Sequence, residues 1–207
     1  MAIANDALQT LPVFDADAVQ QQIRDGDLLL CSGTHIFSRL IRWATKSPWS
    51  HVAIAMRADP LGRVMVLESV ERIGVRTIPF HTFVFGVGGK HPYPGRIVLA
   101  RHARLTAASR ETLRRVAQFG VDQLGDPFAP GEVLKIGARV IVGSLNQKMP
   151  RAMKARDEYI CSEFVAMCFE EAHVRIPWDG RGFIAPCDFA ADPDVSGIAQ
   201  VRMPAKK

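Results

Sequence analysis

The chain has 207 residues, of which 48% are hydrophobic and 23% are charged. This balance is typical of a globular domain and excludes a disordered or fibrous chain. The formal net charge of +5 is moderate, and basic residues are not interleaved with exposed aromatic ones, so we expect no nucleic-acid binding.

The sequence contains no stretch approaching the roughly 20 consecutive apolar residues of a membrane span. Residues 1–14 lack the basic start and continuous apolar core of a signal peptide. Four cysteines, at positions 31, 161, 168 and 187, show no CxxC spacing, which favours free thiols in a reducing compartment. We therefore expect a cytoplasmic protein as encoded, with delivery by a non-classical route left open.

Hydrophobic periodicity predicts the elements in chain order. A polar leader is expected over residues 1–24, followed by a single domain over residues 25–207. Short apolar runs bounded by turn residues predict strands at residues 28–31, 51–57, 63–69, 74–79 and 96–101. Apolar residues at helical spacing predict helices at residues 35–45, 106–124, 131–145 and 161–173, with Thr106 as the N-cap of the second. Strands flanked by separate helices favour an α+β domain built on a small antiparallel sheet.

Basic residues are densest between positions 96 and 115. A solvated helix face accounts for most of this cluster. The alternative is attraction to an anionic polymer or to a membrane surface, so a peripheral contact of this kind stays open.

Cys161 is predicted to lie in the first turn of an apolar helix. Unpaired backbone N–H groups and the positive end of the helix dipole stabilise a thiolate at such a position. The alternative is a small core residue, since free cysteine is often buried. We assign that second role to Cys168, in the middle of the same helix.

His51 begins a strand in which Ala53 and Ala55 share its face, and such small neighbours leave room for a helix. If residues 58–61 form a four-residue loop, Arg57 pairs with Gly62, and Glu68 lies directly opposite His51. A carboxylate there would fix the imidazole tautomer and stabilise the imidazolium. The alternatives are a histidine satisfied at a strand end and an ordinary surface glutamate.

Three residues flank the proposed reacting groups: Trp49, Ser50 and Tyr159. Either they line a substrate cleft and donate to an oxyanion, or they only pack. The remaining histidines have no HxxxH or HExxH spacing, so we expect no metal site and no cofactor.

Four short motifs occur in this order along the chain, with the histidine motif before the cysteine motif: Gly26 to Leu29, Ser47 to Ile54, Val66 to Ser69, and Tyr159 to Phe164. With the late segment Ile184 to Phe189, this set resembles the circularly permuted NlpC/P60 family, the YiiX/YaeF/YebB-like group that is distantly related to lecithin:retinol acyltransferases. The resemblance implies a permuted papain-like α+β fold, with a sheet or partial barrel packed against helices and the cysteine helix late in the chain. It also implies a triad of Cys161, His51 and Glu68. The main departure is a helical insert at about residues 104–157.

The resemblance implies a cysteine hydrolase that cleaves an amide or ester bond. Cell-wall peptide is the first substrate expected. The alternatives are an acyltransferase or acyl hydrolase acting on lipids at a membrane surface, and a catalytically silent binding domain on the same fold. The expected partners are thus a peptide-like or acyl substrate, and the oligomeric state is left open.

Overall fold

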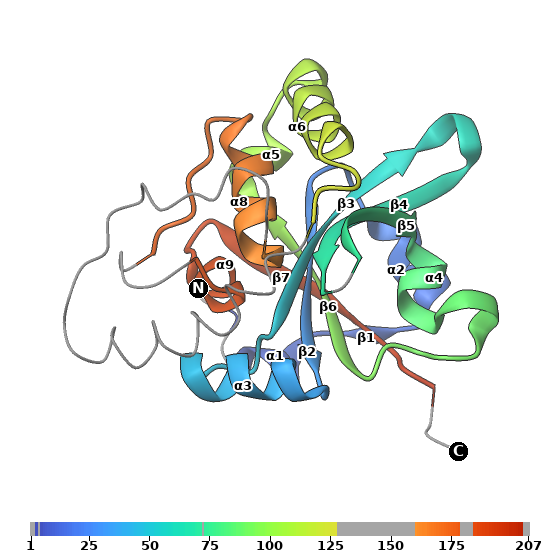
Figure 1. Cartoon of the computed structure of the whole chain (residues 1–207), viewed down its shortest axis with the longest axis vertical. Coiled ribbons are helices and arrows are strands. Elements are labelled where there is room, and N and C mark those ends of the chain that lie inside the picture. Colours follow the sequence, from blue (N-terminus) through green and yellow to red (C-terminus); the bar gives the residue numbers. More distant parts are fainter. Residues whose placement is uncertain (1–2, 4, 72, 128–159, 179–183, 205–207) are drawn as a thin grey trace.

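The structure is a computed structural model that describes residues 3, 5–71, 73–127, 160–178 and 184–204. Its centre is a seven-stranded sheet in the order β1-β7-β6-β2-β3-β4-β5 (Figure 1). All neighbouring strands are antiparallel except β1 and β7, which are parallel. The strands are β1 (Val13–Phe14), β2 (Asp27–Gly33), β3 (His51–Ala58), β4 (Arg63–Val70), β5 (Gly74–Pro79), β6 (Gly95–His102) and β7 (Val195–Val201).

Helices cover both faces of this sheet. In Figure 1, α6, α8 and α9 lie on one side, and α2 and α4 lie on the other. The helices are α1 (Asn5–Thr10), α2 (Ala16–Gln22), α3 (Ile36–Thr45), α4 (Phe80–Phe85), α5 (Ala103–Thr106), α6 (Arg110–Asp122), α8 (Cys161–Glu170) and α9 (Pro186–Ala191), with short 3₁₀ turns η1 (Asp59–Leu61) and η2 (Val87–Gly89). None of the helices in the described ranges combines the length and apolar character needed to cross a bilayer.

Strand alternation divides the core into two parts. Leu28 and Leu30 of β2 pack with α8 residues such as Phe164, whereas Leu29 packs with Val19 of α2. Successive side chains of a strand point to opposite faces, so one apolar run supplies both cores. This explains why residues 28–31 form a continuous apolar run rather than an alternating one.

The five expected strands are present, each with ends within two residues of the prediction. The expected helix over residues 106–124 is divided into α5 and α6, because the Ser109 side chain, not that of Thr106, accepts from the backbone N–H of Thr112 and caps α6. The helix at 161–173 ends at Glu170. The helix expected at 131–145 lies outside the described residues.

Residues of the expected leader contribute to the fold. Ile3 and Leu8 are buried in the core on the α8 side. The β1 strand pairs with β7, and the backbone N–H of Gln200 donates to the Pro12 carbonyl. Gly197 of β7 accommodates this segment, since a Cβ there would lie 2.9 Å from a methyl carbon of Leu11.

The hairpin register differs from the prediction by two residues. Arg57 pairs with Val64 rather than with Gly62, and Ala58 pairs with Arg63. The loop begins at η1 instead, and Gly62 closes it with a left-handed φ of 59°. His51 and Glu68 are therefore not directly opposite each other. A two-residue displacement keeps every side chain on its predicted face.

Candidate active site

Cys161 is the first residue of α8, after Ile160, which has extended backbone dihedrals. The first intrahelical bond of this turn runs from the Phe164 N–H to the Ile160 carbonyl, so the N–H groups before it have no partner within the helix. The apolar face of α8 packs against β3 and β4. Burial of that face brings the thiol to the start of β3.

His51 is the first residue of β3, and its Nε2 lies 2.7 Å from Oε2 of Glu68. The His51 side chain is 14% exposed and the Glu68 side chain only 2%. The contact expected between these two residues is thus confirmed, although they meet diagonally. Ala53 and Ala55 do leave room for helices, but these helices are α2 and α4. The helix α8 packs on the opposite face of β3.

Arg76 completes the environment of Glu68. It lies directly opposite Glu68 on β5, and its Nε and Nη2 donate to Oε1 at 2.9 and 2.7 Å. One carboxylate oxygen therefore binds the guanidinium and the other binds the imidazole. The sequence prediction missed Arg76. If Val70 is paired with Gly74 across the turn, counting two residues away from the turn on each strand places Arg76 opposite Glu68.

Charges within this cluster favour an ion pair. Burial alone would lower the pKa of His51, but the nearby Cys161 and the Glu68 carboxylate, which binds the ring, raise it to about 10. Burial alone would raise the pKa of Cys161, but His51 and the backbone of Val52 and Ser162 lower it. The pKa of Glu68 is also lowered, by His51 and Arg76 against the effect of burial. A thiolate beside an imidazolium is the state that these contacts stabilise.

Two further side chains adjoin the triad residues and were not singled out from the sequence. Cys31 pairs with His51 across β2 and β3, and its Sγ donates to the Leu29 carbonyl at 3.7 Å. Tyr93 stacks on Phe83 with ring centroids 5.7 Å apart, and Phe83 stacks on His51 at 6.5 Å. Burial raises the pKa of both Cys31 and Tyr93, so each stays protonated. Tyr93 is thereby a neutral hydroxyl near the Cys31 thiol.

Trp49 and Ser50 have packing and backbone roles. Trp49 is buried, and its Nε1 donates to the Ile3 carbonyl at 3.2 Å. Ser50 Oγ accepts from the Gly33 N–H at 2.8 Å, which fastens the end of β2 to the start of β3. The geometry offers no support for an oxyanion or substrate role of these two side chains. Tyr159 lies outside the described residues.

Cys168 lies in the core, as expected. It is fully buried, and burial raises its pKa to about 12. Gly120 of α6 approaches it closely, because a Cβ there would lie 3.5 Å from the Cys168 sulfur and 2.7 Å from a methyl carbon of Leu67. The two cysteines of α8 therefore differ strongly in thiol acidity.

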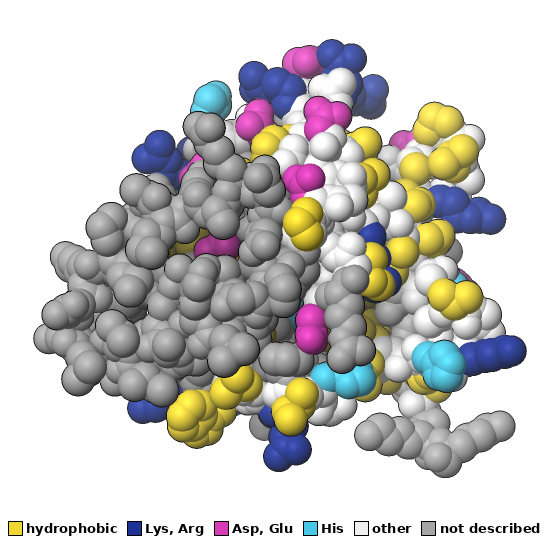
Figure 2. All heavy atoms as spheres, in the orientation of Figure 1, with side chains coloured by type: hydrophobic (Ala, Val, Ile, Leu, Met, Phe, Trp, Pro, Cys, Tyr) yellow, Lys and Arg dark blue, Asp and Glu magenta, His cyan; other side chains and the backbone are white. Residues whose placement is uncertain are grey.

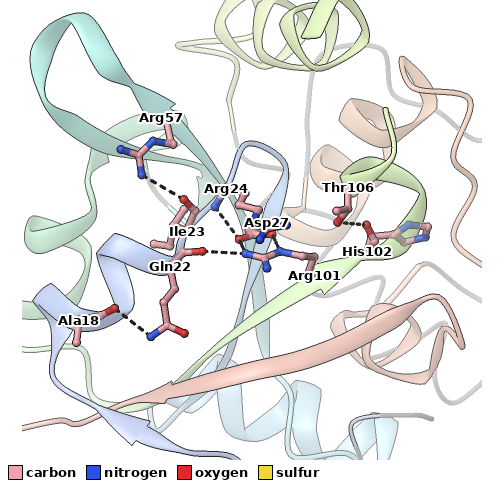
Figure 3. Close-up of polar contacts among 9 residues, drawn as sticks. All are labelled: Ala18, Gln22, Ile23, Arg24, Asp27, Arg57, Arg101, His102 and Thr106. Atoms are coloured by element: carbon pink, nitrogen blue, oxygen red, sulfur yellow. Dashed lines mark hydrogen bonds and ion pairs between the residues drawn. The ribbon is translucent and has the colours of Figure 1, made fainter. Parts of the chain in front are cut away.

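Asp27, the residue after Gly26, has a structural role in a network with Arg101 and Gln22 (Figure 3). Gly26 has a left-handed φ of 84°, and the buried Asp27 accepts from Nε and Nη2 of Arg101, both at 2.7 Å. Arg101 also donates to the Gln22 carbonyl. These bonds join α2, β2 and β6 at one point. Arg101, which belongs to the basic cluster at 96–115, is thus committed to an internal ion pair.

One group among the described residues has the donor types of a metal site: His102, Asp192 and Asp194, with candidate ligand atoms within 4.8 Å of one another. Two of the three donors, His102 and Asp192, already have protein partners. His102 Nδ1 accepts from the Arg104 N–H, and its Nε2 lies 3.5 Å from Asp192. Asp192 in turn accepts from the Asp194 N–H. The group fits a metal ion poorly, because His102 caps α5 through Nδ1 and its Nε2 faces Asp192.

No family model matches the chain, and no curated protein sequence matches it significantly. A solved structure does match: that of the metalloprotein YiiX from Escherichia coli O157:H7, DUF1105, at a TM-score of 0.62 and 19% sequence identity. The match covers 88% of this chain and 99% of that one. The chain therefore has the YiiX-type α+β fold, with the cysteine helix late in the sequence. The resemblance to the YiiX-like group is confirmed at the level of the fold.

Proposed function

We propose that the protein is a cysteine hydrolase that cleaves an amide or ester bond through Cys161, His51 and Glu68. The observation that carries the proposal is the buried His51–Glu68 contact of 2.7 Å beside a thiol whose pKa is lowered. A nucleophile, a base and a group that orients the base are what acyl transfer to sulfur requires. The proposed reaction does not need a cleft or oxyanion role for Trp49, Ser50 or Tyr159.

The reaction begins with the Cys161 thiolate and the His51 imidazolium. The sulfur attacks the carbonyl carbon, and the backbone N–H of Cys161 donates to the developing oxyanion. Because Nε2 of His51 is engaged by Glu68, Nδ1 is the nitrogen that gives its proton to the leaving amine or alcohol as the bond to carbon breaks. Water then attacks the thioester, His51 accepts its proton, and the acid leaves with the thiolate restored.

Arg76 acts as a positioning residue in this proposal. Its two hydrogen bonds hold one oxygen of Glu68, so that the other oxygen stays directed at His51. The guanidinium also keeps the buried carboxylate ionised. An ionised Glu68 is what stabilises the imidazolium.

The description of YiiX as a metalloprotein belongs to that protein. In this chain Nε2 of His102 lies 3.5 Å from the Asp192 carboxylate, which also accepts from the Asp194 backbone N–H, and the proposed steps use thiol chemistry alone. Cell-wall peptide remains the first substrate class proposed.

A turnover screen over peptidoglycan fragments, simple amides and acyl esters tests the proposal. Cys161→Ser and His51→Ala should each abolish turnover and leave the thermal midpoint within a few degrees, since neither change removes much apolar volume. Cys168→Ser is the matched control: it should lower stability by burying a hydroxyl, with activity retained in the folded fraction.

An alkylating probe separates a hydrolase from a silent binding domain. Cys161 should be modified rapidly, because thiolates are the reactive form. Turnover that survives Cys161→Ser, or a Cys161 as inert as Cys168, would overturn the assignment.

A further inference from the structure

The helix α3 presents an apolar face to solvent. Ile36 is 78% exposed, Leu40 is 37% exposed and Trp43 is 72% exposed. Spacings of four and three residues place these side chains on one side of a helix. A contiguous apolar face of this kind on a soluble domain marks an interaction surface.

Cations surround the apolar residues. Arg39, Arg42 and Lys46 lie on or just after α3, which contains no acidic residue. A hollow of about 430 Å³ lies at the end of the helix, lined by Arg39, Arg42, Trp43, Lys46, Ser47 and Pro48. Figure 2 shows hydrophobic and basic side chains together along the lower edge of the molecule, where Figure 1 places α3.

We propose that α3 docks on the surface of an anionic membrane. Ile36, Leu40 and Trp43 enter the headgroup region, and Arg39 and Lys46 bind lipid phosphates at the hollow. Arg42 lines the hollow while its Nη1 holds the Gly33 carbonyl. Helices that lie in the interface combine an apolar face with Lys and Arg at its borders. Tryptophan favours this depth, and each cation near an anionic surface strengthens binding.

The mixture of side chains favours a bilayer over a soluble polyanion. A polyanion would bind the cations but leave the three apolar side chains in water. A bilayer satisfies both sets at once, because phosphates lie directly above acyl chains. The occupant is therefore the membrane surface.

The docking surface adjoins the candidate active site. Arg42 Nη1 donates to the Gly33 carbonyl, and the Gly33 N–H donates to Ser50, the residue before His51. Docking would thus hold the start of β3 near the lipid. The inference goes beyond the proposed function and does not depend on it, since no α3 residue belongs to the triad.

The basic cluster at 96–115 is a weaker surface. Arg101 is paired with Asp27, Arg104 donates to the His173 carbonyl, and Arg114 is paired with Glu111. Arg110 and Arg115, two exposed arginines on α6, supply a matched control for charge reversal.

Co-sedimentation with vesicles tests the proposal on the full chain. We expect binding to vesicles of equal parts phosphatidylcholine and phosphatidylglycerol, and little binding to phosphatidylcholine alone. Trp43→Ala and the double variant R39E/K46E should each weaken binding at least about tenfold. The controls R110E/R115E and Val87→Ala, which changes an exposed apolar residue elsewhere, should stay within about twofold of the parent. Cys161→Ala should bind like the parent, which separates docking from catalysis.

Three results would overturn the proposal. The first is an absence of binding to anionic vesicles by the parent chain. The second is an equal loss in the α3 and α6 charge variants. The third is a Trp43→Ala effect on self-association without vesicles, which would make a second copy the occupant. Thermal midpoints establish that each variant is folded. Tryptophan emission should shift to the blue on vesicles, and this shift should be absent in Trp43→Phe, so it reports insertion independently of binding strength.

Discussion

Four cysteines of one chain occupy environments that differ in their electrostatics. Cys161 has a cation beside it and backbone N–H groups around it, and its pKa is lowered. Cys31 is also buried, and that burial, together with the nearby Glu68 charge, raises its pKa well above the ordinary value. Position at a helix start, next to an imidazolium, is therefore what distinguishes the proposed nucleophile from the other thiols.

Alkylation of Cys161 should be fast and should stay fast in mildly acidic solution. Its thiolate persists until the pH falls through a pKa below the ordinary value of about 8.5. The imidazolium partner is lost only as the pH rises through about 10. Peptide mapping after brief iodoacetamide treatment at pH values from about 6 to 9 measures the rate at each cysteine.

His51→Ala is the control for that profile. Without the imidazolium the thiol pKa should rise, and labelling of Cys161 at about pH 6.5 should slow at least tenfold. A rate that is the same with and without His51, or labelling of Cys31 ahead of Cys161, would contradict the ion pair.

Changes at Glu68 and Arg76 should have graded effects. Glu68→Gln should slow turnover far less than Cys161→Ser, because an amide still orients the ring while stabilising the imidazolium less. Arg76→Met should lower the free energy of unfolding by about 1–3 kcal/mol, since a buried carboxylate loses a charged partner. Urea unfolding and the pH profile of kcat/KM measure the two effects. In Glu68→Gln the basic limb of the kcat/KM profile should move to lower pH. A limb that stays in place would argue against the orienting role of Glu68.

At the scale of elements, the Asp27–Arg101 pair determines how β2, β6 and α2 meet. The two side chains are 2% and 16% exposed, and the Arg101 guanidinium also binds the Gln22 carbonyl. A buried pair of this kind contributes little net stability compared with apolar residues, but a single unpaired partner is costly. We interpret the pair as a specific junction between elements.

Arg101→Ala should destabilise the fold by about 3–5 kcal/mol, because it leaves the Asp27 carboxylate buried without its cation. The double variant D27L/R101M should recover most of that loss. Chemical denaturation of both variants gives the comparison. Equal destabilisation in the single and double variants would show that packing, not charge, is responsible.

At the scale of the whole molecule, the amino-terminal segment packs against elements from the carboxy-terminal part of the chain. The β1 strand lies beside β7 at one edge, and the Ile3 N–H donates to the Ala190 carbonyl of α9. The backbone of residues 3 and 5–14 is thus part of the domain's packing. Loss of this segment would open the core on the α8 side.

Leu8→Ala should lower the free energy of unfolding by about 2–5 kcal/mol, because Leu8 is buried in that core. Leu61→Ala is the matched control, since Leu61 is 70% exposed at the tip of the β3–β4 hairpin, and it should change stability by less than about 0.5 kcal/mol. Similar unfolding midpoints for the two variants would show that the amino-terminal segment contributes nothing to the core.

Local signals account for the elements that were predicted. Apolar runs flanked by glycine, proline and aspartate marked the ends of β3, β4 and β5, where turn chemistry is strong. The strand β7 was missed because Gly197 and polar residues interrupt its apolar pattern. That strand forms because neighbours on both sides complete its ladder, which is tertiary information.

The sequence by itself determined that Cys161 begins a helix, that His51 begins a strand, and that Glu68 shares the face of His51. The first two properties follow from helical and strand periodicity, which are local. The third followed from the expected hairpin pairing, and the two-residue error in that pairing left the face unchanged. Only the tertiary structure decided the hairpin register, the second bond of Glu68 to Arg76 and the approach of α8 to the end of β3. Those features depend on how separate elements pack, and packing energies arise from contacts between residues that are distant in the chain.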